Sequence, residues 1–164
     1  PVGDRLTDHA TADADPPHDV VVDVDEIEVK VQHEGIVLGV GGQALNLTCG
    51  PHGVYGANVR DCAAVTAAAL MCRTSSYWSV GGFDEQIPVA FNDVDFCLRL
   101  GARGHRVVYT PWGELYHAES ASRGALHPAE DEATYAQRWG RVGSKRDAFY
   151  NAHLDLLDPF VLRL

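Results

Sequence analysis

The sequence predicts a single α/β domain. Apolar runs short enough to be strands alternate with segments of helical periodicity, a pattern typical of a sheet covered by helices. The 164 residues are close to the usual size of one domain and can bury a core. Residues 1–18 are rich in acidic residues and proline, so we expect a disordered or loosely attached tail before a domain spanning 19–164.

The elements follow from periodicity and from turn residues. Apolar patterns predict strands at 20–31, 36–40, 65–72, 105–109 and 113–117. Capping residues and glycine stops predict helices over 75–80 after Thr74, from Asn92 to Arg103, and from Pro128 to Gly140. Recurrent glycine, proline and asparagine predict a long loop from Gln43 to Asn58, and the segment after Gly140 is expected to wrap irregularly around the core.

Charge and composition narrow the function classes. The net charge of −10 argues against a nucleic-acid partner, because no basic stripe is present to replace counterions on phosphates. No apolar run is long enough to cross a membrane, and no signal-peptide pattern is visible. The four cysteines form no Cys-x-x-Cys pair, which favours buried thiols over a disulfide or zinc framework. We therefore expect a cytoplasmic protein, either free or at the inner face of the membrane.

Two aspartates at the start of the 92–103 helix are predicted to differ. On a helical wheel Asp95 lies with Arg99 on one arc, where the two can pair at i, i+4, so this arc is interpreted as the solvent face. Asp93 falls on the opposite, apolar side beside Cys97. Asp93 is either an acid stabilised by the helix dipole, the reading that the helix alone favours, or a general base that takes a proton from a hydroxyl.

A histidine at the end of a predicted strand is a second candidate. His117 is followed by a polar loop with two serines and Arg123, which could cradle a phosphate. A lone histidine in such a place is more often a structural hydrogen-bonding residue, so both interpretations stay open.

Five motifs in a fixed order carry a family resemblance. They are Val65–Arg73, Gly81–Glu85, Asn92–Arg99, Gly104–Pro111 and Tyr116–Arg123. In this order they resemble the C-terminal half of a family 2 glycosyltransferase of the rhamnosyltransferase-like kind, and the stretches Val31–Gly39 and Arg138–Gly140 are also similar. The resemblance implies a GT-A fold, a mixed sheet flanked by helices, and transfer of a sugar with inversion from a nucleotide-sugar to a saccharide acceptor hydroxyl, as in cell-surface polysaccharide biosynthesis.

The resemblance also implies roles for individual residues. Asp93 corresponds to the catalytic base and His117 to a metal ligand, with Mg²⁺ or Mn²⁺ as the expected ion. The turn Gly82, Phe83 and Asp84 corresponds to the acceptor side. Ser120, Ser122 and Arg123 correspond to a loop near the diphosphate.

The nucleotide-binding half of such an enzyme is largely absent from the sequence. That half ends in an Asp-x-Asp metal motif, which Asp23 and Asp25 imitate after an apolar strand. These two residues are either metal ligands or charged residues on a chance strand, and the short distance to Gln32 favours the second interpretation.

Two functions remain open at this point. The chain is either the acceptor-side part of an active glycosyltransferase, cut from a longer chain or completed by a second polypeptide, or an inactive remnant that serves as a binding or self-association module. A truncated domain would leave an unpaired sheet edge, so we expect a homo-oligomer.

Overall fold

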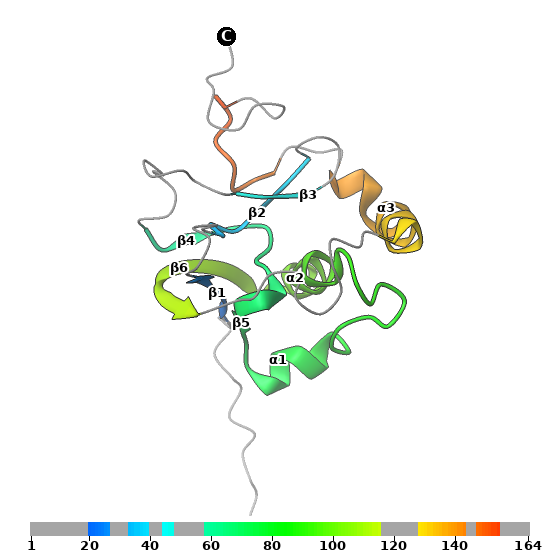
Figure 1. Cartoon of the computed structure of the whole chain (residues 1–164), viewed down its shortest axis with the longest axis horizontal. Coiled ribbons are helices and arrows are strands. Elements are labelled where there is room, and N and C mark those ends of the chain that lie inside the picture. The colour runs from blue at the N-terminus through cyan, green and yellow to red at the C-terminus, as the bar shows by residue number, and fades with distance from the viewer. Residues whose placement is uncertain are drawn as a thin grey trace, which may run out of the picture.

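The computed structural model of the protein describes residues 20–26, 33–39, 44–47, 58–115, 128–143 and 147–154. They form two sheets and three α-helices (Figure 1), which confirms the predicted α/β class. The larger sheet has the order β4 (Arg60–Asp61), β6 (Arg106–Leu115), β1 (Val20–Glu26) and β5 (Leu70–Met71). Strands β1 and β6 are parallel, whereas the other neighbours are antiparallel. The smaller sheet pairs β2 (Ile36–Leu38) antiparallel with β3 (Ala44–Asn46).

The helices are α1 (Thr74–Ser79), α2 (Asn92–Ala102) and α3 (Ala129–Gly143). Figure 1 shows α2 at the centre, with the larger sheet on one side and α3 on the other. The inner face of α2 is apolar, and it packs against β6 in the main core. Members of this core include Val65, Val94, Phe96, Cys97, Leu100, Val107 and Tyr109.

A second apolar cluster lies at the smaller sheet. Val37 and Leu47 pack with Tyr150 and Leu154 from the C-terminal part of the chain. The segment 147–154 is therefore an irregular wrap against the core, as expected, and residues 155–164 lie outside the described part of the chain.

Two predictions about strands are wrong in part. The segment 65–72 is not one strand, because a 3₁₀ turn (Ala67–Ala69) precedes β5. The Thr66 hydroxyl accepts the Ala68 N–H at 3.3 Å and caps this turn. The expected loop from Gln43 to Asn58 contains β3, because its backbone pairs with β2 in a register that joins Leu38 to Ala44.

The strands predicted on either side of Pro111 are one strand, β6. Between Asp23 and Asp25, strand β1 advances two residues while β6 advances five, from Tyr109 to Glu114. Pro111 lies in this irregular stretch of β6. Because proline has no N–H to donate, the interruption of the pairing with β1 lets β6 continue through Pro111.

The helix boundaries also differ in detail from the prediction. Arg73, rather than Thr74, is the N-cap of α1 and makes no side-chain cap bond. The N-cap of α2 is Phe91, one residue before Asn92, and α3 runs to Gly143 instead of Gly140. The predicted stop after α1 is confirmed, since Gly81 and Gly82 have φ of 81° and 71°.

Burial of the cysteines follows the prediction at two of the three described positions. Cys62 and Cys97 are buried in the core, Cys72 is half-buried, and all three are thiols. None of the helices in the described ranges combines the length and apolar character needed to span a membrane.

Candidate functional site

The start of α2 carries the candidate base on an unusual backbone. Phe91 adopts a left-handed conformation, with φ of 58°, and its carbonyl accepts the Asp95 N–H at 2.9 Å. A bulky residue rarely adopts this conformation, and such outliers cluster at functional sites. Phe91 is fixed by burial and by stacking on Tyr135, with ring centroids 4.5 Å apart. Asn92 Oδ1 accepts the N–H of Asp93 at 2.7 Å and orients the next residue.

Asp93 is half-buried, with both carboxylate oxygens hydrogen-bonded. Its Oδ2 accepts the Ala67 N–H at 3.1 Å and its Oδ1 accepts the Val94 N–H at 2.8 Å. Burial raises the pKa of Asp93 above its ordinary value, while these N–H groups and the His33 imidazole act in the opposite direction. Asp93 therefore combines features of both interpretations. Backbone N–H groups hold it at the helix start, and its raised pKa makes it a stronger base than an exposed carboxylate.

The prediction that Asp95 decorates the surface is wrong. Asp95 is 0% exposed, because α3 packs over the arc of α2 that was expected to face solvent. The expected Arg99 pair does form, at 2.7 Å. Two donors from α3 complete the site: Arg138 Nη1 at 2.7 Å and Trp139 Nε1 at 2.8 Å. A buried carboxylate with these three partners fastens α3 to α2.

The turn after α1 is joined to the same cluster. Arg138 Nη1 also lies 2.7 Å from Asp84 Oδ2, so one nitrogen bridges Asp84 and Asp95. Asp84 Oδ1 accepts the Gln86 N–H at 2.8 Å. This backbone bond, followed by the Arg138 pair, lowers the pKa of Asp84. The acceptor-binding role of Asp84 stays a prediction, and the structure shows that its carboxylate already bridges to Arg138.

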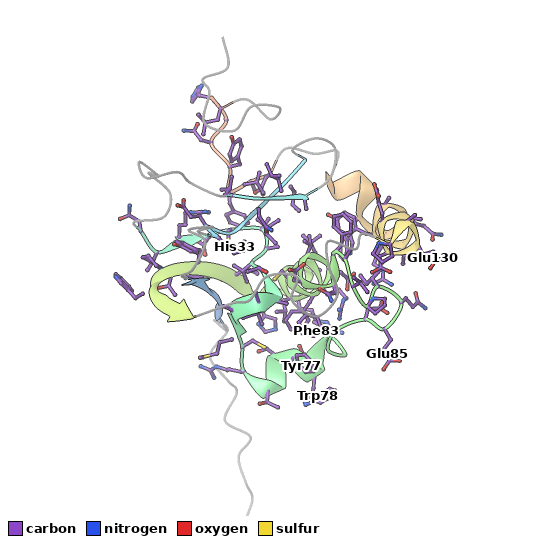
Figure 2. The ribbon with its side chains drawn as sticks, in the orientation of Figure 1. His33, Tyr77, Trp78, Phe83, Glu85 and Glu130 are labelled. Carbon is purple, nitrogen blue, oxygen red and sulfur yellow. The ribbon has the colours of Figure 1, made fainter. Side chains whose placement is uncertain are left out.

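Gly82 and Phe83 have clear packing roles in this turn. A Cβ on Gly82 would lie 2.7 Å from the Tyr77 ring, so only glycine fits. Phe83 is 37% exposed and packs against Phe96 with ring centroids 4.9 Å apart. Figure 2 shows Tyr77 and Phe83 together beside α1.

His33 is a buried imidazole for which the sequence suggested no role. It lies at the start of the segment that leads into β2 and is 8% exposed (Figure 2). His33 belongs to the stretch Val31–Gly39, which contributed to the family resemblance without pointing to any single residue. Arg138 and Trp139 were likewise part of a resembling motif, but the sequence alone could not show that both bind Asp95.

The remaining predicted site residues are not brought together here. His117, Ser120, Ser122 and Arg123 lie outside the described residues. Asp23 and Asp25 belong to β1, which confirms the strand and leaves their metal role a prediction. In the ranges that the structure describes, no group of three histidine, cysteine, aspartate or glutamate residues is arranged to hold a metal ion.

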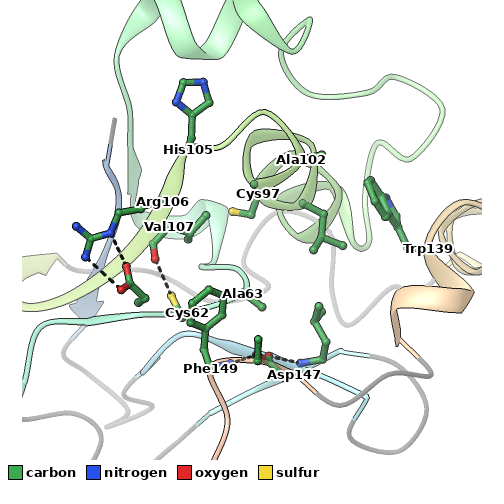
Figure 3. Close-up of a pocket in the computed structure, with 15 residues that line it drawn as sticks. Cys62, Ala63, Cys97, Ala102, His105, Arg106, Val107, Trp139, Asp147 and Phe149 are labelled. Carbon is green, nitrogen blue, oxygen red and sulfur yellow. Dashed lines mark hydrogen bonds and ion pairs between the residues drawn. The ribbon is translucent and has the colours of Figure 1, made fainter. Parts of the chain in front are cut away.

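A cavity of about 700 Å³ lies at the C-terminal end of α2 (Figure 3). Its lining is mainly apolar, and the Arg106–Asp61 ion pair contributes polar groups. Asp93, at the opposite end of α2, does not line this cavity. The cavity is therefore separate from the candidate base.

Comparison with known proteins supports the resemblance. The chain is 39% identical over 147 residues to the uncharacterized protein y4gI of Sinorhizobium fredii. This match covers 81% of the chain and 16% of that protein. It is 40% identical over 138 residues to the O-antigen biosynthesis protein RfbC of Myxococcus xanthus, covering 79% of the chain and 11% of RfbC. It is 38% identical over 75 residues to the N-acetylglucosaminyl-diphospho-decaprenol L-rhamnosyltransferase of Mycobacterium tuberculosis. This match covers 43% of the chain and 24% of that enzyme.

These matches cover only a part of each relative. The chain spans between 11% and 24% of the length of these curated relatives. No protein-family model and no solved structure matches it. The chain is thus similar to segments of proteins named for O-antigen biosynthesis and rhamnosyl transfer, and its resemblance to the glycosyltransferases is confirmed.

Proposed function

We propose that the chain is the acceptor-side part of a GT-A glycosyltransferase and that Asp93 is its general base. The observation that carries this proposal is the placement of Asp93. The carboxylate is held at a helix start by the Ala67 N–H, beside a strained residue, in a site where burial raises its pKa. A general base is most effective when its pKa lies near the working pH, so a raised carboxyl pKa suits this task.

The proposed reaction is a direct displacement. Asp93 takes the proton of the acceptor hydroxyl, and the acceptor oxygen forms a bond to the anomeric carbon of the donor sugar. The bond between that carbon and the diphosphate oxygen breaks with inversion, and the nucleoside diphosphate leaves. The Gly82–Asp84 turn lies on the acceptor side, and Ser120, Ser122 and Arg123 would bind the diphosphate.

A divalent cation is part of the proposal. Mg²⁺ or Mn²⁺ would be held by His117 with Asp23 and Asp25, because carboxylate oxygens and one imidazole suit these ions. When bound, the cation would neutralise charge on the leaving diphosphate.

The test is a transfer assay with Asp93→Asn. Release of nucleoside diphosphate is followed with a panel of nucleotide-sugars, saccharide acceptors and Mn²⁺. The variant is expected to lower kcat by at least about 100-fold while the KM for the donor stays the same, since only the proton acceptor is removed.

Asp61→Asn is the matched control, because Asp61 pairs with Arg106 at a partly exposed position. Equal rates in wild type and Asp93→Asn would contradict the proposal. A chain that binds neither Mn²⁺ nor a nucleoside diphosphate in calorimetry would favour the alternative of an inactive binding module.

A further inference from the structure

Three aromatic side chains form a continuous surface at α1 and the turn that follows it. The Tyr77 ring meets the Trp78 ring edge to face, with ring centroids 4.9 Å apart, and lies 5.9 Å from the Phe83 ring. We call Trp78, Tyr77 and Phe83 the aromatic strip, and Figure 2 shows its three rings together beside α1. Trp78 is 67% exposed and Phe83 is 37% exposed, so the aromatic strip presents ring surface to solvent.

The aromatic strip is anchored to the core. The ring of the fully buried Phe96 lies 4.9 Å from that of Phe83 and 5.5 Å from that of Tyr77, measured between centroids. The Tyr77 hydroxyl accepts the Phe83 N–H at 3.3 Å, and the Tyr77 carbonyl accepts the Gly82 N–H at 2.9 Å. The rings are therefore held in place before a ligand arrives, which lowers the entropy cost of binding.

The size of the aromatic strip favours a small ligand over a protein partner. An aromatic side chain can bury about 150–250 Å², so the exposed parts of Trp78 and Phe83 together offer about 200 Å². A specific protein–protein interface buries about 800 Å² on each partner. The exposed surface of the strip is thus matched to one or two ligand rings.

The polar groups beside the aromatic strip favour a neutral ligand rich in hydroxyl groups. Asp84 directly follows Phe83, and its carboxylate is fixed by Arg138 Nη1 at 2.7 Å and by the Gln86 N–H at 2.8 Å. Glu85 comes next and is exposed (Figure 2). Carboxylates accept hydrogen bonds from hydroxyl groups and repel phosphates, which opposes a stacked nucleotide. A neutral pyranose fits both features, because its C–H face is apolar and its rim carries hydroxyl groups.

We propose that the aromatic strip is a saccharide-binding subsite, in which a neutral pyranose stacks on Trp78 and Phe83 and donates a hydroxyl hydrogen bond to the Asp84 carboxylate. Binding involves no covalent step. The strip includes part of the Gly82–Asp84 turn, so we assign the bound sugar to the acceptor. This assignment, unlike the binding itself, rests on the proposed function.

The direct test is a ¹⁵N NMR titration of the chain with three neutral disaccharides, cellobiose, maltose and chitobiose. The chain has three tryptophans, so each indole N–H signal is identified by its loss in the corresponding Trp→Ala variant. The Trp78 signal is expected to shift with at least one of these sugars. Trp112, which is 80% exposed on β6, is the control, and its signal should stay in place. No shift at Trp78, or equal shifts at Trp78 and Trp112, overturns the inference.

A second measurement follows the sugar by saturation-transfer difference NMR. The signals of its ring protons should be lost in Trp78→Ala, kept in Trp112→Ala and restored in Trp78→Tyr, with circular dichroism confirming that each variant folds. Sugar signals that persist in Trp78→Ala overturn the inference. If Trp78→Ala does not fold, the titration of the unmodified chain decides.

Sedimentation velocity tests the other occupant of this surface, a second copy of the chain. Sugar bound at Trp78 is expected to leave the sedimentation coefficient of the chain unchanged. Self-association that Trp78→Ala abolishes and that the disaccharides do not weaken would make the strip an interface between copies, which overturns the inference.

The transfer assay separates this inference from the proposed function. Trp78→Ala is expected to raise the KM for the acceptor by about tenfold, because an aromatic contact is lost, while kcat and the KM for the donor stay the same. Transfer with equal acceptor KM in wild type and Trp78→Ala overturns the subsite and leaves the proposed function in place. Sugar binding at Trp78 without transfer from any donor supports the subsite and counts against the proposed function.

Discussion

At the scale of single residues, the two acids of α2 show how burial decides a role. Asp93 and Asp95 are two positions apart, yet Asp93 is bound by backbone N–H groups and Asp95 by side chains of another helix. Three charge-assisted donors stabilise Asp95. Asp93 is partly dehydrated, which raises its pKa, and its printed hydrogen bonds come from backbone N–H groups.

Asp93→Asn is therefore expected to stabilise the fold at neutral pH. The pKa of Asp93 is raised from 3.8, so its contribution to stability is present below that value and is lost as the pH rises through the folded pKa. Asparagine carries no charge and keeps one oxygen for the Ala67 N–H, but it loses the bond from the Val94 N–H, so the expected gain is small. Thermal melts across acid and neutral pH should show a higher Tm for the variant at neutral pH and no gain in acid. A lower Tm at neutral pH would contradict this reasoning.

Gly82→Ala tests the turn after α1. Alanine at positive φ costs about 1–2 kcal/mol, and a Cβ at 2.7 Å from the Tyr77 ring forces a shift that costs about 1–3 kcal/mol more. Gly81→Ala is the matched control, because Gly81 has a similar φ but no atom within 4 Å of the point that a Cβ would occupy. Urea denaturation should give the larger loss for Gly82, and equal losses would argue against the close contact.

At the scale of elements, the contact between α2 and α3 depends on Arg138. Its Nη1 bridges Asp84 and Asp95, so it joins α3, α2 and the turn after α1. Arg138, Asp84 and Asp95 thus hold α2, which carries the candidate base Asp93, against α3.

Arg138→Met is expected to lower the free energy of unfolding by about 3 kcal/mol, because it removes one partner of a buried carboxylate. Arg106→Met provides the control: its pair with Asp61 is exposed, so its removal should change stability little. Urea titrations of both variants give the comparison. Similar stabilities for the two variants would show that Asp95 is satisfied by Arg99 and Trp139 alone.

At the scale of the whole molecule, the larger sheet ends in short strands. β5 forms one edge with two residues, and Met71 there is 74% exposed. Among the described strands β5 has β1 as its one neighbour, and an exposed apolar side chain at a sheet edge favours pairing with another chain. The homo-oligomer therefore stays a prediction, and the edge at β5 is the surface through which we expect two copies to associate.

Sedimentation velocity over a range of concentrations should show self-association that Met71→Lys weakens, since a charged edge opposes strand pairing. Leu45→Lys, at an exposed residue of the smaller sheet, should leave association unchanged. A monomer at all concentrations would contradict the prediction.

Local sequence was sufficient to predict the α/β class, the strand at β1 and the stop at Gly81 and Gly82. Each of these depends on local periodicity or on backbone conformation, which neighbouring residues specify. The resemblance to glycosyltransferases also came from motif order alone.

Long-range packing, in contrast, was needed to establish the role of Asp95 and the continuity of β6 through Pro111. A helical wheel shows which residues share a face but not which element covers that face. The α3 donors to Asp95 therefore could not be predicted from the wheel. Likewise, β6 continues through Pro111 beside β1, which pairs with it on both sides of the break. Such pairings join residues distant along the chain, and their free energy depends on contacts that no local pattern encodes.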